Sequence, residues 1–305
     1  MNILLYNIKK RITKIMSNPV KQHIIPEFYL KYFSNSQGFL EVYDSEQDKF
    51  FEPQKPCNTG YQKHVYTIEN SDNSKCYDIE LALSQIEGIA KPILDKLISE
   101  KRINSREKSE LSLFFALLYQ RTIKHFNYME NFINVLNKSR LKLINLAKPN
   151  VIEKNKDLIH ELEQQPTKNQ ILSLSFGNIE LTNMLKNVFE KQNWTIFVVP
   201  KSYNIITTDA PVIEDYSNVK KAIKSFPNAN KIIPISPNKV LCVSQKGSRI
   251  RYIKVHDEEQ IRGLNTIIYI NRNRFVYSRE KSQIENLKNY TNNFKRICKI
   301  SSNQL

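Results

Sequence analysis

The spacing of apolar residues changes twice along this 305-residue chain, and this change constrains its fold more than any other feature. Residues 37–68 alternate apolar and polar side chains between turn-forming residues, which is typical of short strands. From Ile79 to Leu97 the apolar residues recur every three or four positions, which predicts an amphipathic helix. Strand-like alternation returns after Asn193. The sequence therefore predicts an α+β fold in which a helical middle layer packs with β segments from the N-terminal and C-terminal thirds.

The predicted strands lie in two groups. In the first group, residues 39–43, a turn at residues 44–48 and a return strand from Phe50 predict a β-hairpin, and residues 65–68 form a further candidate. Strands in the C-terminal third are predicted at residues 194–199, 204–207, 231–235, 240–244, 250–255, 266–270 and 275–278.

The predicted helices fill the middle of the chain. Asn104 and Glu107 have the spacing of a capping box, which predicts the start of a second long helix that runs to about Asn137. This helix is apolar on nearly all sides between Leu111 and Tyr119, so we expect it to be the central, buried helix. Further helices are predicted at residues 154–164, 178–192 and 281–296.

The domain organisation is predicted to be simple. We find no internal repeat and no flexible linker, so residues 21–305 are expected to form a single α+β domain after an N-terminal extension, residues 1–20. The extension places a short apolar patch before its basic residues, the reverse of a secretory signal. Met16 could be the natural start in place of Met1, which would make the first fifteen residues a frayed helix or a misassigned extension.

Composition excludes several classes of protein. Only 6 glycines are present and no glycine-rich phosphate loop is found, which disfavours the nucleotide-binding folds built on such loops. Cys57, Cys76, Cys242 and Cys298 form no C-x-x-C pair, so we expect no zinc finger and a reducing, cytoplasmic setting. The most apolar run, residues 111–119, is about half the roughly 20 residues of a membrane-spanning helix. We therefore expect no membrane partner.

The net charge favours a nucleic-acid partner. Lys and Arg number 46 against 30 Asp and Glu, so the formal net charge is +16, which attracts polyanions. A solvated lysine-rich surface is the alternative, because the chain is rich in Lys, Asn and Ile together, as an AT-rich genome produces without selection.

The first candidate site residue is His23, in the aromatic segment of residues 22–33. Pro26 biases Ile25 toward extended geometry, which would hold His23 in place. An imidazole at a rigid position suits proton transfer near neutral pH. A packed histidine that binds backbone groups is the structural alternative.

Two acidic residues form the second candidate. Glu80 and Glu87 are seven residues apart, close to two helical turns, so their carboxylates share one side of the predicted helix. They could hold Mg²⁺ or Mn²⁺ through oxygen ligands or pair with an arginine. A solvated helix flank is the alternative.

The third candidate is the Gln-Arg-Thr segment at residues 120–122. On one continuous helix, Arg121 and His125 share the face of Phe114 and Leu118, so a buried guanidinium is predicted. Such a group needs an anionic partner, either in a buried ion pair or as a phosphate clamp. The candidate partners are Glu80, Glu87 and Asp209.

The fourth candidate is the Thr-Thr-Asp-Ala-Pro-Val segment at residues 207–212, directly after a predicted strand. Asp209 could point into a site or cap backbone amides in a structural turn. No serine-hydrolase elbow and no H-E-x-x-H pair is found, so those enzyme classes have no support.

In this order the four segments resemble a widespread microbial family known as domain of unknown function 4238. The matching positions are His23, Pro26, Tyr29, Leu30 and Phe33, the acidic stretch 78–87, residues 120–122, the turn 207–212 with Thr208 in a serine position, residues 234–237, and Asn265. The resemblance spans residues 21–278 and leaves out residues 1–20, which favours Met16 as the start. It implies that six residues converge in space, but it implies no activity. These six are His23, Glu80, Glu87, Gln120, Arg121 and Asp209.

The leading hypothesis is a nucleic-acid phosphodiesterase that favours RNA over DNA, in a bacterial toxin or anti-phage role. The residues assigned to catalysis are His23, Gln120, Arg121 and Asp209, and those assigned to Mg²⁺ or Mn²⁺ are Glu80, Glu87 and Asp209. A metal-free reaction is equally compatible, in which His23 and Arg121 act on RNA and the 2′-hydroxyl is the nucleophile. The alternatives are a non-catalytic nucleic-acid or nucleotide-binding module, and a buried network that only stabilises the fold.

Overall fold

The computed structural model describes residues 19–146, 149–217 and 225–302. The predicted extension lies outside this part of the chain except for residues 19 and 20, and so does Met16. The predicted α+β class is confirmed, and the prediction of a single domain stays a prediction. No helix in the described ranges combines the length and the apolar character that a membrane crossing requires.

The larger sheet is built almost entirely by the C-terminal third. Its strand order is β12-β7-β11-β10-β9, with β12 parallel to β7 and all other pairs antiparallel. The strands are β7 (Gln192–Val198), β9 (Ile213–Asp215), β10 (Asn230–Ser236), β11 (Lys239–Lys246) and β12 (Ile250–Lys254).

The second sheet joins the two ends of the chain. Its order is β3-β2-β13-β8, and all its pairs are antiparallel. The N-terminal third contributes β2 (Glu41–Asp44) and β3 (Lys49–Phe50), which is the predicted hairpin, and the C-terminal third contributes β8 (Thr207–Thr208) and β13 (Phe275–Ser278). Two small ribbons pair β1 (Lys21–His23) with β4 (Tyr61–Lys63) and β5 (Ile68–Glu69) with β6 (Lys75–Cys76).

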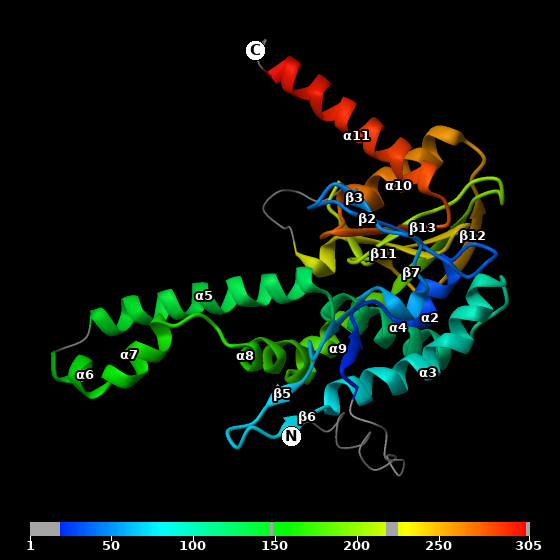
Figure 1. The fold of residues 1–305 in the computed structure, drawn as a ribbon. Helices are drawn as coiled ribbons and strands as arrows, with labels where there is room; N and C mark the ends of the chain where they lie inside the picture. The colour runs from blue at the N-terminus through cyan, green and yellow to red at the C-terminus, as the bar shows by residue number, and fades with distance from the viewer. Residues whose placement is uncertain (1–18, 147–148, 218–224, 303–305) are drawn as a thin grey trace.

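Helices cover the sheets from two sides (Figure 1). On one side lie α2 (Glu27–Tyr32), α3 (Asp78–Ile98), α4 (Ser105–Gln120) and α9 (Ile179–Glu190), and on the other lie α10 (Glu258–Ile270) and α11 (Lys281–Ser302). Helix α5 (Ile123–Asn145) extends away from the body of the molecule, and α6 (Pro149–Lys154) and α7 (Lys156–Glu163) fold back along its far end (Figure 1). The remaining turns are α8 (Lys168–Leu172), a π-helical turn η2 (Ser173–Gly177), and the 3₁₀ turns η1 (Pro56–Asn58) and η4 (Phe226–Asn228).

Helix α4 is the central helix that its apolar sequence predicts. The Asn104 side chain accepts a hydrogen bond from the Glu107 backbone amide, and the Glu107 carboxylate accepts one from the Asn104 backbone amide, so the capping box is present. Phe115 is fully buried, and its ring lies 5.7 Å from that of Trp194 on β7. This contact joins the helical layer to the larger sheet in one hydrophobic core.

The prediction of one helix from residue 104 to residue 137 is wrong. The chain forms α4 and α5 instead, with a break at Arg121 and Thr122. Thr122 has extended backbone angles, and its side-chain oxygen accepts a hydrogen bond from the His125 amide at 3.2 Å, so it acts as the N-cap of α5. Arg121 and His125 therefore do not share one helical face.

Two predicted strands are also wrong. Residues 266–270 belong to α10, where Ile261, Asn265, Ile268 and Tyr269 are buried at helical spacing. The C-terminal end of this helix is rich in β-branched residues, which gives it the composition of a strand. Of residues 65–68, only the last is in a strand. In a third segment, residues 204–207, the strand begins only at Thr207.

Candidate functional site

Four of the six residues that we expected to converge lie together. The polar cluster consists of His23 at the end of β1, Tyr66 before β5, Glu80 and Glu87 on α3, and Arg121 at the C-cap of α4. The predicted helical spacing brings both glutamates to the same side of α3. Because α4 ends at Gln120, the chain turns there and the Arg121 guanidinium meets α3 rather than continuing the helix.

Arg121 is the most deeply buried charged residue of the polar cluster, with only 2 % of its surface exposed. Its Nη1 atom donates to Oε1 of Glu87 at 2.5 Å, and Nη2 donates to the carbonyl oxygen of His23. The guanidinium lies 5.7 Å from the centre of the Tyr66 ring, and the Tyr66 hydroxyl donates to the Arg121 carbonyl at 2.8 Å. Burial by itself lowers the pKa of Arg121, but Glu87 and Tyr66 raise it above its ordinary value, so the group stays charged.

Glu80 is a carboxyl of the polar cluster whose pKa lies near neutral pH. Burial raises its pKa to about 7, an effect that the charge of Arg121 opposes and that of Glu87 reinforces. Its Oε2 atom is buried and has no hydrogen-bond partner within the described residues. Glu80 can therefore be protonated or ionised near pH 7.

His23 is held as a neutral imidazole. Burial lowers its pKa, with Arg121 adding to this and Glu27 and Glu87 opposing it. The ring is hydrogen-bonded to the backbone of Pro56 and contacts the edge of Tyr61 at 5.7 Å. Nε2 is buried, and no described group is hydrogen-bonded to it, so this atom is the one able to accept a proton.

Gln120 lies outside the polar cluster and connects helices. It is fully buried, its side-chain nitrogen donates to the Ser175 carbonyl at 2.7 Å, and its oxygen accepts from the Thr182 hydroxyl at 3.2 Å. These bonds join α4 to η2 and α9. Its side-chain amide is therefore engaged in contacts between helices.

Asp209 also lies apart from the polar cluster. Its two carboxylate oxygens accept hydrogen bonds from the backbone amides of Asn273 at 3.0 Å and Arg274 at 2.9 Å. Burial raises the pKa of Asp209, and these backbone amides oppose the rise. Asp209 thus caps backbone amides, as one alternative for its turn predicted, and it also lines a pocket.

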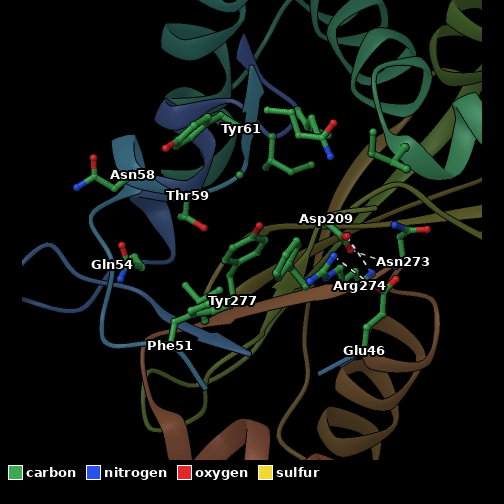
Figure 2. Close-up of a pocket in the computed structure, with 17 residues that line it drawn as sticks. Glu46, Phe51, Gln54, Asn58, Thr59, Tyr61, Asp209, Asn273, Arg274 and Tyr277 are labelled. Carbon is green, nitrogen blue, oxygen red and sulfur yellow. Dashed lines mark hydrogen bonds and ion pairs between the residues drawn. The ribbon is translucent and has the colours of Figure 1, made fainter. Parts of the chain in front are cut away.

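That pocket, here called the aromatic pocket, has a volume of about 600 Å³. Residues 24 and 25 after β1, together with residues 58–62 leading into β4, form one wall, and Phe51 with β13 and the Asp209 turn forms the other (Figure 2). Its lining includes the aromatic and amide side chains of Phe51, Gln54, Asn58, Tyr61, Phe275 and Tyr277. Asp209, Asn273, Arg274 and Glu46 gather at one end (Figure 2).

Arg274 is the residue of this pocket that the sequence reasoning missed. Its guanidinium makes a bidentate contact with Asp44, with Nη2 to Oδ2 at 2.6 Å, and a second ion pair with Glu46 at 3.2 Å. Asp44 is fully buried; burial by itself raises its pKa, but Arg274 and the amides of Glu46 and Gln47 bring it below its ordinary value. The two partners are 230 positions apart, and no local pattern marks them. The only signal was an arginine directly before a predicted strand.

The expected metal site is not assembled. Among the residues that the structure describes, no three His, Cys, Asp or Glu side chains are grouped in a way that could hold a metal ion. Glu87 is already paired with the Arg121 guanidinium, and Asp209 lies in the aromatic pocket. The residues assigned to Mg²⁺ or Mn²⁺ therefore do not fit a shared site.

Several residues of the shared sequence motif have structural roles. The Tyr29 hydroxyl is hydrogen-bonded to the Thr207 side chain at 2.9 Å and to the Pro234 carbonyl, which joins α2 to both sheets. Asn265 accepts from the Ile206 amide at 3.0 Å and donates to the Asn204 carbonyl at 2.9 Å. These bonds position the turn that carries Asp209.

Comparison with known proteins gives a family and no activity. Residues 21–282 match the family described as "Protein of unknown function (DUF4238)". No curated protein and no solved structure matches the chain.

Proposed function

The chain belongs to the DUF4238 family, and from this premise we propose that it is a nucleic-acid phosphodiesterase that cleaves RNA rather than DNA by general acid–base catalysis. One observation carries the proposal. His23 and Glu80, two groups able to exchange a proton near neutral pH, lie in one cluster beside the buried charge of Arg121.

The substrate supplies the nucleophile in this reaction. Nε2 of His23 takes the proton of the 2′-hydroxyl, the 2′-oxygen bonds to phosphorus, and the bond from phosphorus to the 5′-oxygen breaks. Glu80 donates its carboxyl proton to the departing 5′-oxygen, which leaves a 2′,3′-cyclic phosphate and a 5′-hydroxyl. Near pH 7 the imidazole is neutral, as a base must be, and Glu80, with a pKa of about 7, carries the acid's proton in about half of the molecules. DNA lacks the 2′-hydroxyl and cannot react in this way.

Arg121 has a positioning role. Both of its terminal nitrogens are occupied, by Glu87 and by the His23 carbonyl, so it holds the segment that carries the base. Its buried positive charge also stabilises negative charge that develops on a nearby phosphate. The reaction needs no cation at Glu80, Glu87 or Asp209.

Two further features support an RNA substrate in the cytoplasm. The net charge of +16 favours a polyanionic partner. Cys57, Cys76 and Cys242 are free thiols, which suits a reducing compartment. An RNA-cleaving enzyme of this size suits a bacterial toxin or anti-phage role.

The test compares cleavage of labelled single-stranded RNA and DNA of one sequence, with EDTA and with Mg²⁺. We expect RNA cleavage under both conditions and none of DNA. His23→Gln and Glu80→Gln should each lower the rate by about 10²–10⁴-fold, the usual contribution of a general acid or base. His256→Gln is the matched control, because His256 is exposed and should leave the rate unchanged.

Two results would contradict the proposal. One is undiminished cleavage by both variants, provided that they keep the wild-type melting temperature. The other is loss of cleavage in EDTA, which would point to the metal-dependent reaction instead.

A non-catalytic nucleic-acid or nucleotide-binding module is the second candidate, because the positive net charge favours RNA binding whether or not a bond is broken. It predicts binding that weakens steeply with salt and no turnover in the same assay.

A further inference from the structure

We propose that the aromatic pocket is a base-recognition site for guanine, an inference that rests on the proposed function for its role in RNA cleavage. The shape of the pocket, the hydrogen-bonding groups at its end and its charge all suit this base.

The walls of the pocket suit a planar ring. Phe51 and Phe275 lie 6.4 Å apart between ring centres and form an apolar surface next to Tyr277, and Tyr61 lies on the opposite wall (Figure 2). The volume of about 600 Å³ is ample for a nucleoside. Bases are held in protein pockets by stacking on such side chains.

The charged end of the pocket presents two adjacent acceptors. Asp209 has only 9 % of its surface exposed, and each of its carboxylate oxygens accepts one backbone amide. A carboxylate oxygen has two lone pairs, so each oxygen keeps one for a ligand. Guanine is the one common base with two neighbouring donors on its Watson–Crick edge, N1–H and the N2 amino group. Adenine, cytosine and uracil each place an acceptor beside a donor there.

The charge at the Asp209 end of the pocket disfavours binding of a phosphate and favours binding of an uncharged base. Arg274 is the positive group at this end of the pocket, and it is paired with Asp44 at 2.6 Å and Glu46 at 3.2 Å. With Asp209, three carboxylates therefore surround one guanidinium. A phosphate would meet net negative charge here, whereas hydrogen-bond donors of an uncharged base are favoured.

The pocket also borders the polar cluster. Tyr61 lines the pocket and contacts the His23 ring at 5.7 Å, and Ile24, another lining residue, directly follows His23. The ribose and phosphate attached to a guanine in the pocket would then lie at the border with the polar cluster, next to His23. Cleavage is therefore expected next to guanosine.

The test measures binding of the four uncharged nucleosides to the full-length protein by isothermal titration calorimetry. We expect guanosine to bind about tenfold or more tightly than adenosine, as a bidentate base contact provides. Inosine keeps N1–H and lacks the N2 amino group, so it should bind between the two.

Two variants test the residues. Asp209→Asn removes one of the two acceptors and should abolish the preference for guanosine. Because this change also disturbs the backbone amides, Phe51→Ala provides an independent test through the loss of stacking, with the exposed Phe132→Ala on α5 as its control. Equal affinity for all nucleosides, or no guanosine binding, would overturn the inference, as would unchanged preference in folded Asp209→Asn.

The outcomes separate this inference from the proposed function. Guanosine binding without RNA cleavage supports the pocket and contradicts the enzyme. RNA cleavage without a preference for guanosine supports the enzyme and contradicts the pocket.

Discussion

Three atoms of the polar cluster, His23 Nε2, Glu80 Oε2 and Arg121 Nε, are buried without a hydrogen-bond partner in the described part of the chain. A buried polar atom in this state is unfavourable and needs an explanation, because nearly all such atoms in proteins are paired. Structural needs alone would favour apolar residues of similar size at these positions. Their coincidence in one cluster is what a site for an external polar group would require.

The Glu80 carboxyl makes stability depend on pH in a direction that can be measured. Its pKa rises from an ordinary value of 4.5 to about 7 in the folded protein, so the folded state binds the proton more tightly than the unfolded state. The stabilisation is therefore fully present below about pH 4.5 and is lost as the pH rises through 7. Glu80→Gln should remove this dependence.

The measurement is the difference in unfolding free energy between Glu80→Gln and wild type, by urea denaturation from pH 4.5 to 8. The difference should move steadily in favour of the variant up to about pH 7 and then level off. The lowered pKa of His23 has the opposite effect and reduces stability in acid. Because His23 is present in both proteins, this effect cancels in the difference. A flat difference would contradict the raised pKa.

At the scale of elements, the break between α4 and α5 determines where Arg121 points. Thr122 makes the break, because its hydroxyl donates to the Tyr119 carbonyl at 2.9 Å and accepts from the His125 amide at 3.2 Å. The Thr122 side chain thus caps both the C-terminal end of α4 and the N-terminal end of α5. On an unbroken helix the guanidinium would have continued the apolar face of α4.

Removing the Thr122 hydroxyl should therefore destabilise the protein. We expect Thr122→Ala to lower the unfolding free energy by about 1 kcal/mol, the typical value of an N-cap. Thr122→Ser keeps the hydroxyl and is the matched control. Urea denaturation followed by the fluorescence of the buried Trp194 measures both, and equal stability of the two variants would contradict the role of the cap.

At the scale of the whole molecule, the two ends of the chain are joined in one sheet. Strand β13 lies between β2 and β8, so the N-terminal hairpin pairs with a strand more than 200 residues away. Arg274 and Asp44 reinforce the same junction, and Tyr29 does so through Thr207. The aromatic pocket forms only where these distant segments meet.

The ion pair at this junction provides a stability test. Asp44 is fully buried, so Asp44→Asn leaves Arg274 without its main partner. Losing one partner of a buried pair costs about 3–5 kcal/mol, and we expect about 2 kcal/mol because Arg274 stays partly exposed to solvent. Urea denaturation measures the loss, with exposed Glu52→Gln as the control. A change of the same size in the control, or none in Asp44→Asn, would contradict the role of the pair.

The site was predictable in part. The pairing of Glu80 with Glu87 on one side of a helix and the need of Arg121 for a carboxylate both follow from local spacing and from the chemistry of a buried charge. The position of Gln120 between helices, and of Asp209 in a separate pocket, depends on how α9 and β13 pack, which no local pattern records. The error over residues 266–270 has a local cause, because β-branched residues there share the composition of a strand.

By itself the sequence determined the class of fold, the central apolar helix with its capping box, and the residue types able to exchange protons or hold charge. These properties depend on neighbours within a few positions, where helical and strand periodicity and capping act. The tertiary structure alone decided that His23, Glu80, Glu87 and Arg121 meet while Asp209 joins Arg274. The physical reason is that these contacts cross up to 230 positions of the chain and arise only when the sheet register and the core packing bring the two ends together.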